Sequence, residues 1–350
     1  MQRLVVHVTD SRFTLEDCPD PVIGQNPYAP YDIIAEVKFA GICGTELYLW
    51  KHGFPKGVLE IDTLGMGHEF SGVVREVGEK VTEVKVGDRI VAEVSIGYCG
   101  KCIMCVSGFH TLCRKVSAFM LHSGAFAKFL PLPEKIVRKI PENVSFEEAA
   151  LCQPLGLAVH SVQIKGKLRA GESVAILGPG PIGLLCLQLA KKTGAAPLMV
   201  TGLSRDRKRL EAASQLGADF AINSEREDVV EKSLKISGGE GFDLVIEIAG
   251  AAEAVRQALE IVRPGGRIVL TGNGYEPVQI DTARKIMMRG VDMLGCRAEP
   301  PLTWTIGLKL LESGLIDCKS LISDILPLRE WEEGFKRASQ SDALKVLLVP

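Results

Sequence analysis

The stretch Ser173-Val-Ala-Ile-Leu177-Gly178-Pro-Gly180-Pro-Ile-Gly183 joins an apolar run to a glycine-rich turn. A strand, a Gly-x-Gly-x-x-Gly turn and a helix together bind the pyrophosphate of a dinucleotide. The first glycine permits the turn, the second lets the backbone approach the pyrophosphate, and the third lets the helix pack on the strand, while the helix N-terminus stabilises the anion. A turn that is merely rich in glycine is the alternative. The candidate cofactor residues of this turn are Gly178, Gly180, Pro181, Ile182 and Gly183.

Beyond this turn, strands and helices alternate along the chain. Apolar runs predict strands at 174–177, 198–201, 243–247 and 267–270, and helices are predicted from Ile182 and over 207–215. Alternation of this kind is typical of a doubly wound parallel sheet. We therefore expect an α/β fold in which residues 154–292 form a Rossmann coenzyme domain.

Residues 1–153 have a different pattern. Short runs rich in β-type residues are separated by Gly, Pro and Asp turns, which predict strands rather than helices. The clearest runs are Leu4–Val8, Ile33–Val37, Ser71–Val77 and Arg89–Val94. Short strands in this number indicate a mostly antiparallel, barrel-like domain.

Four cysteines occur close together in Cys99-Gly-Lys-Cys102-Ile-Met-Cys105 followed by Cys113, at spacings of three, three and eight residues. Thiolates at this spacing can wrap a short loop around one tetrahedral zinc ion and fill all four coordination positions. A zinc site without an open position is structural. Any chemistry is therefore expected elsewhere.

Metal-ligand residue types also occur upstream, at Cys43 in Gly-Ile-Cys-Gly-Thr and at His68-Glu69 in Gly-Met-Gly-His-Glu. A cysteine, a histidine and a carboxylate form zinc sites that leave one position open for a substrate. The alternative for each residue alone is a structural role: Cys43 as a small buried apolar side chain, and His68 as a hydrogen-bonded core histidine. Their combination with Glu69 predicts a catalytic zinc site.

These motifs occur in an order that resembles the zinc-dependent medium-chain dehydrogenases, and most of all their sorbitol, polyol and threonine dehydrogenase branch. The resemblance also includes Val84-Lys-Val-Gly-Asp88-Arg-Ile and covers nearly the whole chain. It implies a GroES-like catalytic domain made of residues 1–153 and 293–350, with a helix over 304–312 on the returning segment. It further implies an oxidoreductase with two zinc ions per chain and NAD or NADP as cofactor.

The family implies roles for individual residues. Zinc held by Cys43, His68 and Glu69, the last directly or in exchange with water, would lower the pKa of the substrate hydroxyl. Thr45 resembles the hydroxyl that bonds to the reacting alcohol and passes its proton onward, with a plain turn residue as the alternative. Arg297 resembles an arginine near cofactor and substrate, or else pairs with a carboxylate at the domain boundary. The residues expected on the nicotinamide side of the cofactor are Ile248, Ala249, Gly250, Thr271, Gly272, Asn273 and Arg297.

Three positions depart from the family pattern. Glu46 stands where the family generally has Asp, and Tyr48 stands where many relatives have a proton-relaying histidine. Gln153 replaces a glutamate whose carboxylate faces the zinc, and Cys152 beside it is a second candidate ligand. With Gln153 neutral, the charges of zinc and of its thiolate and carboxylate ligands sum to zero, so we expect a more electrophilic zinc environment than is usual. Gln153 is therefore a catalytic candidate.

The second strand of the coenzyme domain ends in Gly202-Leu-Ser204-Arg205-Asp206. NAD enzymes of this fold have an acidic residue at the strand end that binds the ribose 2'-hydroxyl, whereas a 2'-phosphate needs a cation. Gly202 occupies the acidic position and Ser204 and Arg205 follow, so NADP is favoured over NAD and Gly202→Asp is expected to favour NAD. The alternative is that Asp206 binds the ribose while Arg205 and Arg209 form a solvated helix face.

Composition sets the remaining limits. The chain has 350 residues, is 46% hydrophobic and carries a net charge of -2, which allows two domains and argues against a nucleic-acid surface. The ten cysteines cluster by metal spacing and no basic-then-apolar leader follows Met1, so we expect a reducing cytoplasm. No apolar run reaches the roughly 20 residues that a membrane helix needs. By resemblance, a homodimer or homotetramer is expected.

Several functions fit these observations. The first hypothesis is hydride transfer between a secondary alcohol of a polyol, sugar or sugar acid and NAD(P), and the second is a threonine 3-dehydrogenase or short-diol dehydrogenase. A zinc-ribbon binding module is disfavoured by the complete nucleotide segment. The non-enzyme alternative is a retired protein that keeps zinc and NADP but has lost turnover through Gln153.

Overall fold

The computed structural model describes residues 1–54, 61–274 and 276–350, and the chain divides into two compact units. The first unit contains residues 1–153, 299–314 and 318–350, and the second contains 154–298 and 315–317. The first division falls after residue 153, where the sequence placed it. The chain leaves the second unit after Ala298 rather than after Asp292, because β16 (Asp292–Gly295) is the edge strand of that unit's sheet.

The second unit is built on a six-stranded parallel sheet, as the alternating pattern predicts. The strand order is β13-β12-β11-β14-β15-β16. All four residues of β11 are buried, which requires cover on both faces of the sheet. This order is that of a doubly wound nucleotide-binding fold, and it reverses between β11 and β14. The other strands are β11 (Val174–Leu177), β12 (Leu198–Gly202), β13 (Phe220–Asn223), β14 (Phe242–Glu247) and β15 (Val262–Leu270).

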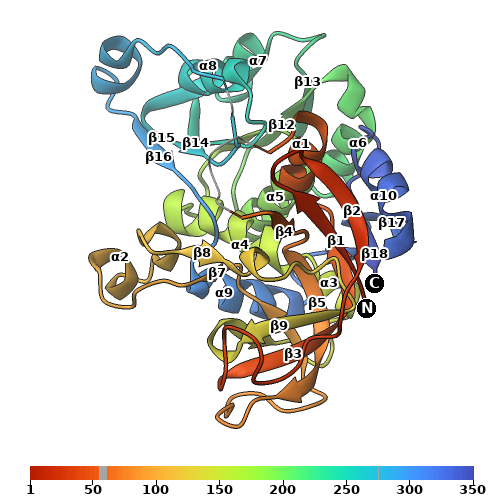
Figure 1. The fold of residues 1–350 in the computed structure, drawn as a ribbon. Coiled ribbons are helices and arrows are strands. Elements are labelled where there is room, and N and C mark those ends of the chain that lie inside the picture. The colour runs from red at the N-terminus through yellow and green to blue at the C-terminus, as the bar shows by residue number, and fades with distance from the viewer. Residues whose placement is uncertain (55–60, 275) are drawn as a thin grey trace. The chain divides into compact units, whose positions relative to one another are not determined.

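Four helices of the second unit pack in two pairs (Figure 1). One pair is α5 (Pro181–Thr193) with α6 (Arg207–Gln215), and the other is α7 (Val229–Ile236) with α8 (Ala252–Ile261). α5 begins at a proline, whose fixed φ and missing N–H suit the first helical position. Among the described residues, no helix is both long and apolar enough to span a membrane.

The first unit is mostly antiparallel, as its short strands predict. Its main sheet has the order β10-β6-β5-β3-β18-β17, with β9 also paired to β3, and of the strand pairs that the structure describes in this sheet, β17 with β18 is parallel and the others are antiparallel. A smaller sheet has the order β2-β1-β4. The strands are β1 (Gln2–His7), β2 (Arg12–Asp17), β3 (Asp32–Gly41), β4 (Thr63–Gly65), β5 (Glu69–Val77), β6 (Arg89–Ala92), β9 (Phe129–Pro133), β10 (Val137–Lys139), β17 (Ile322–Pro327) and β18 (Lys345–Val349).

The C-terminal segment completes the first unit. It supplies β17 and β18 together with α9 (Pro301–Glu312) and α10 (Trp331–Ala338), and α9 contains the helix expected over 304–312. Phe335 on α10 is fully buried and joins the same apolar core as Phe126. Because β18 pairs with β3, residues near the end of the chain lie beside residues 40–42.

Candidate functional site

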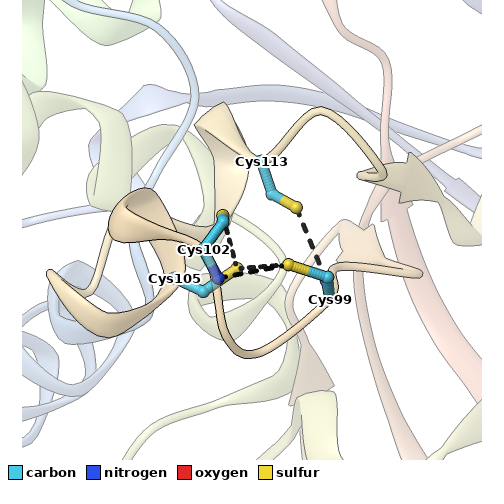
Figure 2. Close-up of side chains that lie close together, drawn as sticks. All are labelled: Cys99, Cys102, Cys105 and Cys113. Carbon is cyan, nitrogen blue, oxygen red and sulfur yellow. Dashed lines mark hydrogen bonds between the residues drawn. The ribbon is translucent and has the colours of Figure 1, made fainter.

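The four-cysteine loop brings its sulfur atoms together. Figure 2 shows Cys99, Cys102, Cys105 and Cys113 around a common centre, and their ligand atoms all lie within 4.8 Å of one another. The loop carries a four-residue helix, α2 (Ile103–Val106), and a single 3-10 turn, η1 (His110–Leu112), and it is flanked by the two-residue strands β7 (Ser95–Ile96) and β8 (Ser117–Ala118). The donor set and its geometry fit one tetrahedral zinc ion with no open position.

Backbone N–H groups of the loop point at two of these sulfurs. Cys102 N donates to the Cys99 sulfur at 3.3 Å, and Lys115 N donates to the Cys113 sulfur at 3.4 Å. The N–H groups of Lys101 and Cys102 lower the pKa of Cys99 to about 6. These N–H groups therefore favour the thiolate form of Cys99, which is the form that binds a metal, whereas burial raises the pKa of Cys105 to about 12.

Cys43, His68 and Glu69 form the second group of metal-ligand atoms. Cys43 is the N-cap of α1 (Gly44–His52), while His68 directly precedes β5 and Glu69 is its first residue. One ligand atom from each lies within 4.8 Å of the others, and His68 and Glu69 are buried. A thiolate, an imidazole and a carboxylate in this arrangement fit a zinc ion with a position left open.

Glu46, in the first turn of α1, contacts two of the three candidate ligands. Its Oε2 accepts from Cys43 N at 3.0 Å, and its Oε1 lies 2.7 Å from His68 Nδ1. Burial lowers the pKa of His68, but the Glu46 carboxylate and Cys43 raise it further, to well above the usual range. Because a carboxylate accepts, Nδ1 donates to Glu46 and Nε2 is left for the metal. The extra methylene of Glu, compared with the family's Asp, still reaches His68.

Removing the charge of Glu46 should weaken metal binding. Glu46→Gln keeps the size of the side chain but offers one oxygen where Cys43 N and His68 Nδ1 need two acceptors. Loss of such a supporting hydrogen bond typically costs about 10–100-fold in metal affinity. Titration of the metal-depleted protein with Zn²⁺ against a competing chelator measures the effect. Glu36→Gln, which alters a half-exposed ion pair with Lys38, is the matched control and should bind zinc like the wild type.

Lys345 is a buried partner of Glu69 that the sequence did not reveal. Its Nζ lies 2.6 Å from Glu69 Oε2 and donates to the Ile42 carbonyl at 3.0 Å. The ammonium is only 4% exposed, so the ion pair is shielded from water. The expected charge sum of zero for zinc, thiolate and carboxylate is therefore incomplete: it omits Lys345 and the buried carboxyl groups of Glu46 and Glu299.

Gln153 is hydrogen-bonded to a buried carboxyl group. Its Nε2 donates to Glu299 Oε2 at 2.8 Å, and both side chains are buried. Burial raises the pKa of Glu299 to about 7, against the opposing effect of the Gln153 hydrogen bond. Burial and Glu299 also raise the pKa of Cys152, which opposes its thiolate form, and no metal-ligand group of the described residues includes Cys152.

Thr45 lies beside the Cys43 side chain. The Cys43 sulfur and Thr45 Oγ1 are 3.8 Å apart, and the Thr45 side chain is exposed. Tyr48, further along α1, has its ring 4.7 Å from the ring of His52. The proton-relay position of the family is thus occupied by a phenol with an imidazole next to it.

In the glycine-rich turn, the space around each glycine is that expected of a phosphate-binding loop. Gly178 has a φ of 122°, and a Cβ there would lie 2.9 Å from Ala249 N. A Cβ at Gly183 would lie 2.0 Å from the Gly178 carbonyl oxygen, so the helix packs on the turn only with glycine there. Gly180, the N-cap of α5, has nothing within 4 Å of its Cβ direction, which leaves room for a pyrophosphate.

Glu247, the last residue of β14, forms hydrogen bonds to two candidate cofactor loops. Its side chain is buried and accepts from Gly250 N at 2.7 Å, while its carbonyl accepts from Thr271 N and Gly272 N at 2.8 and 3.0 Å. Thr271 Oγ1 also lies 2.9 Å from Ser161 Oγ. Ile248, Ala249, Gly250, Thr271, Gly272 and Asn273 thus follow β14 and β15 at the sheet edge where this fold binds ligands. Arg297 is exposed, and no described contact fixes it.

The end of β12 has no carboxylate at the expected position. Gly202 is buried, and a Cβ there would lie 2.7 Å from Pro179 Cγ in the glycine-rich turn. Gly202→Asp would therefore require that turn to shift before a carboxylate could meet the ribose. Asp206 accepts from Leu203 N at 3.1 Å, and Ser204 N donates to Glu225 at 2.7 Å. Arg205 is exposed.

Two protein families match the chain. The "Zinc-binding dehydrogenase" family matches residues 181–313, and the "Alcohol dehydrogenase GroES-like domain" family matches residues 29–142. The second of these matches lies within the first unit, whereas the first covers most of the second unit and continues into residues 299–313 of the first unit.

Individual relatives are similar along nearly their whole length. A sorbitol dehydrogenase of Halalkalibacterium halodurans is 32% identical over 339 residues, which cover 97% of this chain and 96% of the relative. An L-threonine 3-dehydrogenase of Bacillus velezensis is 35% identical over 341 residues, with 96% and 95% covered. A solved structure from Sinorhizobium meliloti 1021, assigned to the zinc-binding dehydrogenases and bound to NADP, has 31% identity and a TM-score of 0.88, with 100% of both chains covered.

Proposed function

Because this chain belongs to the zinc-dependent medium-chain dehydrogenases, in the branch with the sorbitol and threonine dehydrogenases, we propose that it oxidises a secondary alcohol of a polyol, sugar or sugar acid and reduces NAD(P). The observation that carries the proposal is the buried group of Cys43, His68 and Glu69, oriented by Glu46. The four cysteines from Cys99 to Cys113 hold a separate structural zinc.

Each part of the site has a chemical task. Zinc bound at Cys43, His68 and Glu69 supplies the Lewis acidity that makes the substrate hydroxyl more acidic. Glu46 keeps His68 Nε2 free for the metal, and Thr45 accepts the hydrogen bond of the reacting hydroxyl and passes its proton outward. The glycine-rich turn binds the pyrophosphate through backbone N–H groups, and the loops held by Glu247 bind the nicotinamide side of the cofactor.

A substrate screen combined with metal analysis tests this function. Polyols, sugar acids, threonine and short diols are each assayed for reduction of NAD and NADP, on protein whose zinc content is measured. Two zinc ions per chain and turnover of polyols, lost on mild chelation before the protein unfolds, support the proposal. Preferred turnover of threonine or of a short diol would identify the second enzyme hypothesis. One zinc with cofactor binding but no turnover would identify a retired enzyme.

We also propose that the cofactor is NADP rather than NAD. Gly202 supplies no carboxylate to a ribose 2'-hydroxyl, and Asp206 is 7% exposed and caps the backbone at Leu203. Arg205 is exposed, which allows it to meet a 2'-phosphate in place of the Glu225 carboxylate, and Ser204 N would exchange its Glu225 acceptor for that phosphate. A relative crystallised with NADP is consistent with this preference.

Arg205→Ala should remove most of the preference for NADP. A charge-assisted contact to phosphate is worth about 1.5–3 kcal/mol, or roughly 10–150-fold in the ratio of the NADP and NAD dissociation constants. Fluorescence titration with the two reduced cofactors gives this ratio. Arg256→Ala, on α8 and paired with Glu253, is the control and should leave the ratio unchanged. A wild type that prefers NAD, with Arg205→Ala unchanged, would assign the ribose to Asp206 or to water.

The cellular setting follows from the same chemistry. All ten cysteines are free thiols and five of them belong to the two metal-ligand groups, so we propose a reducing cytoplasm. A homodimer or homotetramer is proposed from family resemblance, and light scattering of the purified protein tests it.

A further inference from the structure

The buried carboxyl group of Glu299 differs from the other acidic groups around the candidate zinc site. Glu69 pairs with Lys345, Glu46 with His68 and Cys43 N, and Glu93 with Arg138. Glu299 is 4% exposed and bonded to the neutral amide of Gln153. Within the described residues, no ion pair to a Lys, Arg or His neutralises it.

An unneutralised buried carboxyl group is costly to the fold. Removal of a carboxylate from water without a cation is unfavourable by several kcal/mol. Such a group either takes up a proton, and the pKa of about 7 leaves Glu299 only partly ionised near neutral pH, or it is offset by a positive charge nearby. Glu299 interacts electrostatically with His68 and Glu69, two of the three candidate ligands, so a divalent cation at that site would supply this charge.

The hydrogen bond to Gln153 also fixes the amide. Its Nε2 donates to Glu299, so its carbonyl oxygen is directed away from that carboxyl group. Gln153 is the second residue of α4 (Cys152–Val159), and Glu299 directly precedes Pro300, the N-cap of α9. Two segments 146 residues apart in the sequence thus place one amide and one carboxyl group together.

We propose that Glu299 is a positioning residue of the catalytic zinc site. Glu299 orients the amide of Gln153 and carries the negative charge that offsets the charge of the metal. The two residues together thus perform the role that a single carboxylate at position 153 would have. The proposal rests on the proposed function, because it requires a zinc ion at Cys43, His68 and Glu69.

Metal affinity and stability of the metal-free site respond in opposite directions under this proposal. Glu299→Gln is isosteric and keeps a hydrogen bond to Gln153, but removes the charge. The affinity for Co²⁺, used as the probe at the chelator-depleted catalytic site while the four-cysteine loop keeps its zinc, should fall about 10–100-fold. The unfolding temperature of the same metal-depleted protein should stay equal or rise, because a buried charge without a cation has been removed. A purely structural role predicts a lower unfolding temperature instead.

The swap variant Gln153→Glu/Glu299→Gln exchanges the carboxylate and the amide between the two hydrogen-bonded positions, so the amide–carboxylate pair is kept. It should recover most of the Co²⁺ affinity, and it decides the question alone if Glu299→Gln does not fold. Glu93→Gln is the matched control: it removes another buried carboxyl group and with it the ion-pair partner of Arg138, so it should lower stability and change Co²⁺ affinity little.

The outcomes separate this inference from the proposed function. Wild-type protein that takes up no Co²⁺ at the depleted site would overturn the proposed function. Wild-type uptake with unchanged affinity in Glu299→Gln would overturn the role of Glu299 alone. The same conclusion follows if the folded swap variant recovers no affinity, or if Glu93→Gln weakens Co²⁺ binding as much as Glu299→Gln does.

Discussion

Cys43→Ala is expected to fold like the wild type, to hold one zinc ion per chain instead of two, and to lose about a thousandfold or more in turnover. Cys43 is half-buried at the start of α1 and belongs to no apolar core cluster, so its sulfur contributes little packing. Lewis-acid catalysis is worth several kcal/mol, and each 1.4 kcal/mol or so is tenfold in rate. The thiolate is also the one anionic sulfur in this ligand group.

Zinc content by mass spectrometry, thermal unfolding and turnover of the best polyol measure this result together. Cys18→Ala is the matched control, because Cys18 is also a half-buried free cysteine of the first unit but lies in neither metal-ligand group. It should keep both zinc ions and full activity. Full activity and two zinc ions in Cys43→Ala would remove Cys43 from the ligands.

The sequence predicts well where local pattern decides the structure. β11 has the predicted bounds 174–177, α6 has the predicted bounds 207–215, and the four cysteines converge as their spacing indicates. These features depend on periodicity, turn residues and ligand spacing within a few tens of residues, all of which can be read along the chain. The division into a mostly antiparallel and a doubly wound part follows from the same signals.

The supporting residues of the candidate zinc site were not predictable in this way. Lys345 reaches Glu69 from 276 residues away, because β18 pairs with β3 and thereby brings its first residue beside Ile42. Glu299 reaches Gln153 across 146 residues. A lone Lys or Glu near the end of a chain carries no local signal, since only tertiary strand and helix packing decides what it faces. The charge balance of the site therefore required the structure.

The bounds of the coenzyme unit show the same limit on a smaller scale. The sequence ended this unit at 292, whereas β16 continues the sheet to Gly295 and the unit ends after Ala298. A four-residue edge strand, half of it exposed, has too weak an apolar pattern to be recognised. Edge strands carry fewer buried residues than central ones, so their ends are harder to predict.

The largest effect on stability is expected from Cys102→Ala. The loop from Cys99 to Cys113 contains a four-residue helix, too short to be stable by itself, and Ile103 and Val106 are 69% and 67% exposed. Little apolar burial is thus available to hold the loop. A structural zinc contributes about 10–16 kcal/mol of binding free energy in small zinc domains, and the loss of one of four thiolates removes much of it.

The loop should then open without unfolding the sheets of the first unit, because their strand pairing and core do not include it. We expect Cys102→Ala to lose one zinc ion, to be cut by protease within residues 97–116 much faster than the wild type, and to unfold at a lower temperature. Cys318→Ala, a buried cysteine outside both metal-ligand groups, controls for removal of a thiol and should destabilise the core without opening the loop. Unchanged zinc content and protease resistance in Cys102→Ala would mean that the four cysteines do not share a metal, and that the loop is held by its backbone hydrogen bonds alone.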